Sequence, residues 1–199
     1  MQAFSSRPDV AGLDLQASGL VLDDAGLPHV DFETAQCGDA HVFFAGDVGG
    51  IRPLLHEAVD DGSIAGENAM LWPAVSRHKR RTPLAIGFTD PQMAMVGVRY
   101  DQVPAGHYAI GEASFEDQPR ARMIGRNKGL LRIYAEAPGG TLLGAEMFGP
   151  GVEHLAHLFA WAVQMGMTVE TALSMPFYHP TLEEGLRGAL RDLAEKLRA

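Results

Sequence analysis

The pair His179–Pro180 stands just before a helix-like stretch that carries the carboxylates Glu183 and Glu184. Histidine titrates close to neutral pH, so its ring is the side chain that most often moves protons in catalysis. The carboxylate of Glu184, five residues further on, could hydrogen-bond the His179 ring and fix its orientation. The residue types and their spacing are therefore compatible with an acid/base pair.

The same residues also fit a structural interpretation. Thr181 and Glu184 have the spacing of a capping box, in which a threonine at the helix start pairs with a glutamate three residues later. In a capping box the Glu184 carboxylate would bind a backbone N–H group. A carboxylate has two oxygens and could serve both functions, so the spacing alone favours neither interpretation.

A second candidate site follows the apolar run 42–45, which we interpret as a buried strand that ends at Gly46 and Asp47. Ligands of open α/β sheets bind at the carboxyl ends of strands, and helix N-termini bind anions. Asp47 could therefore accept a hydrogen bond from a sugar-like hydroxyl of a cofactor. It could also simply cap a turn, and composition alone favours the turn.

Three further side chains could carry chemistry but do not complete a site. His154 and His157 lie three residues apart beside Glu153, yet no third metal ligand follows at a suitable spacing. We interpret both as partly buried structural histidines and expect no metal site. The only cysteine, Cys37, lies in a polar stretch without an obvious partner base, so we interpret it as an incidental thiol.

Composition excludes several classes of protein. The chain has 199 residues, of which 46% are hydrophobic and 21% charged, as in globular proteins. A net charge of −9 argues against nucleic-acid binding, which needs a basic face. No apolar run reaches the ~18 residues of a membrane span, and no signal peptide is recognised. One cysteine cannot form an internal disulfide, which favours a cytoplasmic location.

Up to residue 81, the elements that must position the Asp47 region are a hairpin around residues 24–26 and a helix over about 54–71. The basic stretch 77–81 is interpreted as a solvated linker at a domain boundary. The helix residues expected on the buried side are Leu55, Ala58, Val59, Ala65 and Ala69.

From residue 83 onward the sequence predicts an α+β domain, with strands first and helices after them. One helix is expected over about 152–166, and a second, with a leucine stripe, from Thr181. The last two strands are expected to form a hairpin through the turn at 137–140. The predicted strands cover residues 84–88, 93–98, 107–115, 130–136 and 141–149.

Four stretches occur in an order and spacing typical of one protein family. "HVFFAGDV" and "PLLHEAVDDGSIAGEN" are similar to its second FAD motif and the helix after it. "TDPQMAMVGV" resembles the first strands of its interface domain, and "YHPTLEE" resembles its His-Pro-Thr-Leu-x-Glu signature. The family is that of the FAD-dependent pyridine nucleotide–disulfide oxidoreductases, in particular its dihydrolipoamide dehydrogenase-like members. The start, "SRPDVAG", resembles the end of the family's NAD-binding domain.

The resemblance implies three regions. Residues 1–30 would be the remnant of a NAD-binding domain, 31–80 the C-terminal segment of an FAD-binding domain, and 83–199 the dimerisation domain. The last would have an antiparallel-rich sheet with helices on one face. The family's Gly-x-Gly-x-x-Gly loop and its cysteine pair are missing from the sequence. We therefore expect a fragment of a longer protein, inactive alone and without tightly bound FAD or NAD(P).

For the flavin site of the parent protein, the resemblance implies contacts from Asp47, Leu54, Leu55 and His56. The cofactors of the parent would be FAD and NAD(P).

For catalysis, the resemblance implies that His179 and Glu184 form an acid/base dyad that serves the partner subunit's disulfide in a homodimer. The substrate would be a disulfide or a dithiol. Lipoamide-using members often carry a second histidine where this chain has Phe177, so the substrate stays open. The resemblance, together with a tight turn into a capped helix, makes the His179–Pro180 bond a candidate for the cis form. The alternative function is a homodimerisation module without enzyme activity.

Overall fold

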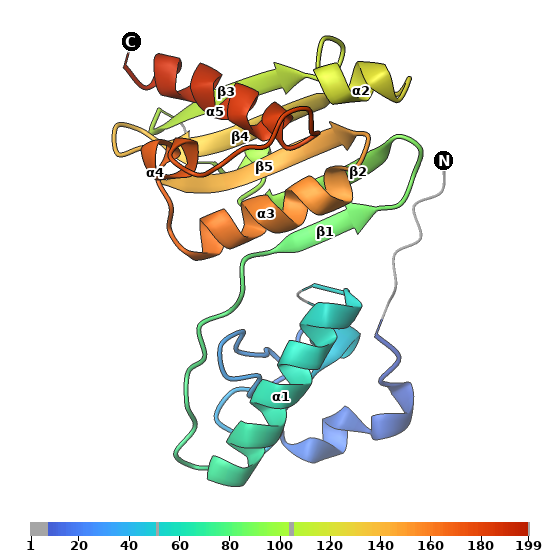
Figure 1. The fold of residues 1–199 in the computed structure, drawn as a ribbon. Coiled ribbons are helices and arrows are strands. Elements are labelled where there is room, and N and C mark those ends of the chain that lie inside the picture. Colours follow the sequence, from blue (N-terminus) through green and yellow to red (C-terminus); the bar gives the residue numbers. More distant parts are fainter. Residues whose placement is uncertain (1–7, 51, 104–105, 199) are drawn as a thin grey trace. The chain divides into compact units, whose positions relative to one another are not determined.

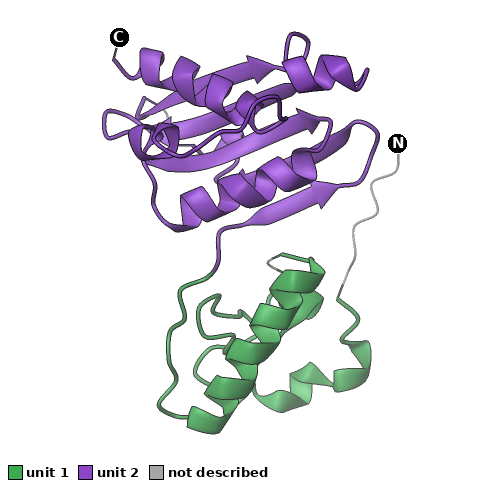
Figure 2. Ribbon diagram, in the orientation of Figure 1, with its two compact units in different colours: residues 1–80 green, residues 81–199 purple. Residues whose placement is uncertain are grey.

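The computed structural model describes residues 8–50, 52–103 and 106–198. The chain divides into two compact units, residues 1–80 (unit 1) and 81–199 (unit 2) (Figure 2). Part of the stretch "SRPDVAG" lies outside the described residues, and the assignment of residues 1–30, 31–80 and 83–199 to domains of a parent protein stays a prediction. Among the described residues, no helix has the length and apolarity needed to cross a membrane.

Unit 2 is built on a five-stranded antiparallel sheet with the strand order β1-β2-β5-β4-β3. The strands are β1 (Leu84–Gly87), β2 (Gln92–Gly97), β3 (Tyr108–Ser114), β4 (Leu130–Glu136) and β5 (Leu142–Gly149). The hairpin of β4 and β5 closes at residues 137–140, where the Glu136 N–H donates to the Thr141 carbonyl. The five predicted strands and the α+β class are confirmed.

Helices cover one face of this sheet (Figure 1). The helix α3 (Val152–Gln164) packs on β1, β2 and β5, and α5 (Glu184–Lys196) packs on β3 and β4. The helix α5 begins three residues later than predicted, at Glu184 instead of Thr181. Three short elements were not predicted, because one turn of helix shows no periodicity: η4 (Tyr100–Gln102), α2 (Pro119–Met123) and α4 (Val169–Leu173).

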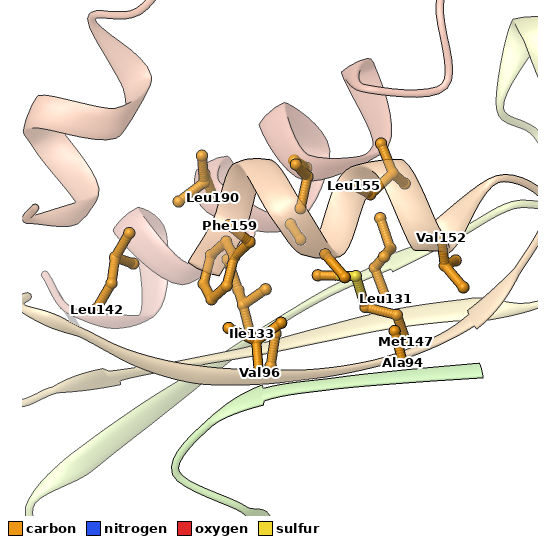
Figure 3. Packing of buried hydrophobic residues seen from close by; sticks show 14 of the residues in the cluster. Ala94, Val96, Leu131, Ile133, Leu142, Met147, Val152, Leu155, Phe159 and Leu190 are labelled. Carbon is orange, nitrogen blue, oxygen red and sulfur yellow. The ribbon is translucent and has the colours of Figure 1, made fainter. Parts of the chain in front are cut away.

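The core of unit 2 lies between the sheet and these helices. Alternate residues of β4 point into it, so Leu131, Ile133 and Ala135 are fully buried. Figure 3 shows Leu131 and Ile133 facing Leu155 and Phe159 of α3. The leucine stripe of α5 is confirmed: Leu186, Leu190 and Leu193 are buried, and Leu182 and Leu197 pack against them partly buried.

Unit 1 contains the helix α1 (Leu55–Leu71) and three 3₁₀ turns, η1 (Ala11–Leu13), η2 (Leu15–Ser18) and η3 (Gly46–Gly49). The predicted helix is confirmed, but its predicted buried face is only partly correct: Ala65 is buried and Ala58 half-buried, whereas the other three residues are exposed. Leu55 and Val59 are 83% and 61% exposed, whereas Glu57 and Asn68 are buried. Asn68 is buried because its side-chain amide hydrogen-bonds the backbone of Thr34, 34 residues earlier, and of Ser76.

Other expectations for unit 1 are also corrected. The run 42–45 is not a buried strand: it makes one isolated bridge, Gln36 with Phe43, and is only half-buried. The stretch 77–81 is solvated only in part: Arg77, Lys79 and Arg81 are exposed, but the Arg80 side chain is only 7% exposed and is ion-paired to α1. The predicted hairpin around residues 24–26 is present, with Leu22 bridged to Pro28.

Candidate functional site

The segment between α4 and α5 brings His179 and Glu184 together. Nδ1 of His179 lies 2.8 Å from Oε2 of Glu184. The His179 side chain is 67% exposed, whereas that of Glu184 is 8% exposed. The His179–Pro180 peptide bond is cis, as the family resemblance favoured. A buried carboxylate thus holds an exposed imidazole, which leaves the ring accessible to other molecules.

Glu184 also serves the backbone, but not through a complete capping box. Its Oε2 accepts the Thr181 N–H at 3.4 Å. The Thr181 hydroxyl, however, donates to the Tyr178 carbonyl at 2.9 Å and does not cap α5. The residue before the helix, Glu183, makes no side-chain cap hydrogen bond either. One carboxylate therefore combines half of the capping pattern with the histidine contact.

The electrostatics keep this carboxylate charged. Burial raises the pKa of Glu184, but hydrogen bonds from His179 and the Thr181 N–H, together with the charges of His179 and Arg187, outweigh it, so the pKa is lower than usual. An ionised carboxylate only accepts hydrogen bonds. The proton of a neutral His179 is therefore on Nδ1, and Nε2 is the nitrogen that can take up another.

Arg187 is a member of this cluster that the sequence interpretation missed. Its Nη2 donates to Oε1 of Glu184, the oxygen that His179 does not use. Its guanidinium carbon also lies 5.8 Å from the centre of the Phe177 ring. The signal was present in the sequence, since residues three apart on a helix are neighbours and Arg187 follows Glu184 by three.

An apolar groove adjoins this segment. Its volume is about 250 Å³, and Phe177 lines it together with Trp161 of α3, Met165 just after that helix and Leu190 of α5. Phe177 is half-buried. Phe177, which stands where lipoamide-using members of the family often carry a histidine, is therefore part of an apolar wall.

The predicted flavin-contacting residues gather where η3 packs against α1. Asp47 is exposed in η3, Leu55 and His56 are exposed in the first turn of α1, and Leu54 precedes the helix without a side-chain cap. Gly46 has a φ of 76°, and a Cβ atom there would lie 3.2 Å from Cβ of Ala58. The turn is therefore tied closely to the helix and presents the Asp47 carboxylate outward.

This arrangement fits part of a flavin site. A carboxylate at an exposed turn accepts hydrogen bonds from hydroxyl groups, such as those of the sugar-like chain of FAD. The neighbouring Leu55 offers apolar surface, and the first turn of α1 offers backbone N–H groups. The residues present would hold one part of FAD.

The remaining candidates do not form a site. His154 and His157 are exposed, so our interpretation of them as partly buried is wrong; His157 Nδ1 lies 2.7 Å from the Glu153 carbonyl. In the described parts of the chain, no group of three or more potential ligands could hold a metal ion. Cys37 is fully buried, and burial raises the pKa of its thiol to about 11. Such a thiol stays protonated and is a poor nucleophile.

The fold of unit 2 is that of a known dimerisation domain. Residues 84–190 match the family described as "Pyridine nucleotide-disulphide oxidoreductase, dimerisation domain". The chain belongs to the pyridine nucleotide–disulphide oxidoreductase family, as the sequence motifs indicated.

Several relatives extend this match to most of the chain. It is 33% identical over 184 residues to the dihydrolipoyl dehydrogenase of Halobacterium salinarum, covering 92% of this chain and 38% of that protein. It is 31% identical over 184 residues to the soluble pyridine nucleotide transhydrogenase of Escherichia coli, covering 89% and 39%. The crystal structure of LpdA from Mycobacterium tuberculosis superimposes with a TM-score of 0.78 at 27% identity, covering 92% and 40%. The chain thus spans about two fifths of the length of its relatives.

Proposed function

We propose that this chain is the C-terminal part of a flavin- and NAD(P)-dependent disulfide oxidoreductase similar to dihydrolipoamide dehydrogenase. Unit 2 supplies the interface of a homodimer, and His179 with Glu184 forms the acid/base dyad for thiol–disulfide exchange. The observation that carries this proposal is the 2.8 Å contact between an exposed imidazole and a buried, ionised carboxylate. FAD, when bound, transfers the electron pair between the nicotinamide and the cysteine pair of the enzyme.

The dyad acts on the thiol protons. Nε2 of His179 takes the proton of a substrate thiol, and the thiolate attacks one sulfur of the partner subunit's disulfide, since the thiolate is the nucleophile. One S–S bond breaks as a mixed disulfide forms, and the other cysteine sulfur leaves as a thiolate. The second substrate thiol then displaces the first cysteine, so two electrons pass from the dithiol to the enzyme. The Glu184 carboxylate stabilises the imidazolium while it holds the proton.

The test uses the full-length protein that contains this chain. His179→Gln should reduce dithiol-dependent turnover by ~10²-fold or more, the usual scale for a positioned acid/base group. Flavin reduction by the nicotinamide should be nearly unchanged, because that step needs no thiol proton. Glu184→Gln should reduce dithiol-dependent turnover less than His179→Gln does, since Glu184 orients the base but transfers no proton.

His157→Gln is a matched control, because His157 is exposed in the same unit and outside the dyad. It should leave dithiol turnover unchanged. Normal turnover of His179→Gln would contradict the proposal.

A homodimerisation module without enzyme activity is the second candidate function. It is favoured by the burial of Cys37, because the single thiol of this chain is inaccessible to a substrate. Both candidates require self-association, so sedimentation at micromolar concentration should give a dimer. The turnover assay separates them, since only the enzyme oxidises a dithiol.

A further inference from the structure

One carboxylate of α1 holds the turn that presents Asp47. Oδ2 of Asp61 accepts the N–H of Gly46 at 3.1 Å. The other oxygen, Oδ1, accepts a hydrogen bond from Nη2 of Arg80. Gly46 directly precedes Asp47, so the position of the Asp61 side chain determines where the chain enters the turn.

Arg80 in turn fixes Asp61. Its side chain is 7% exposed, and a buried charge is tolerated only when it is paired and hydrogen-bonded. Its Nη2 also lies 3.2 Å from Oε2 of Glu57, its Nη1 donates to the Phe32 carbonyl at 3.3 Å, and its guanidinium carbon is 4.4 Å from the centre of the Phe32 ring. These contacts immobilise the guanidinium from several sides.

Glu57 completes the network. Its side chain is 4% exposed, and its second oxygen pairs with Nη1 of Arg52 at 3.2 Å. The basic segment after α1 thus returns along the helix and bonds to two of its carboxylates, Glu57 and Asp61. Its effect reaches Gly46, 34 residues earlier in the sequence.

We propose that Asp61 is a positioning residue for a ligand at Asp47, and that Arg80 holds Asp61 in place. The ligand class is a polyol hydroxyl donor, such as the sugar-like chain of a flavin. The proposal rests on the proposed function, which assigns Asp47 to the flavin.

The first measurement needs no cofactor. Amide hydrogen exchange of Gly46 is followed by NMR on this chain, with Asp61→Ala compared to the unmodified chain. The exchange should become at least ~10-fold faster, because the variant removes the side-chain oxygen that accepts this N–H. Asp61→Asn keeps one acceptor oxygen for the Gly46 N–H but loses the oxygen that accepts from Arg80, so its exchange rate should lie between those of Asp61→Ala and the unmodified chain.

The second measurement is FAD affinity in the full-length protein that contains this chain. Asp61→Ala should weaken FAD binding ~10-fold, equivalent to about 1.4 kcal/mol, and Asp61→Asn should have a smaller effect, because it keeps one acceptor oxygen for Gly46. Glu67→Gln is the matched control on α1, because the Glu67 side chain is 54% exposed and pairs with His78, at 3.8 Å, instead of with Arg80. It should change neither measurement.

Asp47→Ala separates the two proposals. If Asp47→Ala weakens FAD binding and Asp61→Ala does not, the positioning role is refuted and the proposed function stands. If Asp47→Ala leaves FAD affinity unchanged, the flavin assignment is wrong, and the inference falls with it. Unchanged Gly46 exchange in a folded Asp61→Ala chain also refutes the positioning role.

Discussion

At Gly111 of β3, the helix α5 lies very close to the sheet. A Cβ atom added there would lie 2.2 Å from the Ala189 carbonyl oxygen, 2.5 Å from Cβ of Leu193 and 2.9 Å from its backbone nitrogen. A Cβ atom does not lie within about 3 Å of another non-bonded heavy atom in real packing, so Gly111→Ala must displace the helix or the strand. The atoms it meets belong to the backbone or to a Cβ, so no side-chain rotation relieves the contact.

The loss in free energy of unfolding caused by Gly111→Ala can be estimated from this geometry. Overpacking a core usually costs about 1–3 kcal/mol, and the absence of a rotamer escape places Gly111→Ala at about 3 kcal/mol. Gly111 does not have a positive φ, so the alanine adds no backbone strain. The assay is urea unfolding followed by circular dichroism, at one fixed protein concentration because self-association would shift the midpoint.

Gly188 offers a matched control on the other side of the same contact. A Cβ atom at Gly188 would lie 3.5 Å from Cβ of Ala113, an ordinary van der Waals distance. Gly188→Ala also removes a glycine from a helix, which stabilises it by about 1 kcal/mol. We expect opposite signs for the two variants. If Gly111→Ala were as stable as the unmodified chain, α5 would not pack on β3 as described.

Three further predictions follow from single side chains. Leu193→Ala should lower the free energy of unfolding by about 2–5 kcal/mol in the same urea assay, because Leu193 is fully buried and its removal leaves a cavity. Cys37 should react with a thiol reagent at pH 8 far more slowly in the folded chain than in urea, since its thiol is buried and its pKa is raised to about 11; equal rates would contradict its burial. The pKa of Glu184 is lowered by folding from its usual 4.5, so its stabilising contribution is complete above that pH and is lost as the pH falls through the lower folded value. The stability difference between the unmodified chain and Glu184→Gln should therefore shrink in acid unfolding series, and a pH-independent difference would refute the assignment.

The sequence predicted unit 2 well because its elements depend on local patterns. In β4, Leu131, Ile133 and Ala135 alternate with Arg132 and Tyr134, which matches the two faces of a sheet. The leucines of α5 repeat with the helical period for the same reason. The start of α5 was misplaced because Thr181 bonds the Tyr178 carbonyl, which the capping pattern alone does not reveal.

Unit 1 was predicted less well because its structure depends on contacts distant in sequence. Nothing near Glu57 indicates that Arg80, 23 residues later, buries it. Likewise, the apolar run around Phe43 predicts a strand, yet a strand also needs neighbours, and the described residues give it a single bridge.

For the His179–Glu184 pair of unit 2, the spacing in the sequence left two interpretations of Glu184. The structure contains both contacts, because the Glu184 carboxylate binds His179 and also accepts the Thr181 N–H.

The mixed burial of α1 has a thermodynamic consequence. This helix buries Glu57 and Asn68 as well as Ile64 and Ala65, and it leaves Leu55 in contact with water. Hydration of apolar groups raises the heat capacity on unfolding, and hydration of polar groups lowers it. Unfolding of unit 1 therefore exposes only a small apolar cluster, whereas unfolding of unit 2 exposes a full apolar core. Most of the heat-capacity increase of the chain thus belongs to unit 2, and the stability of unit 1 varies with temperature along a much flatter curve.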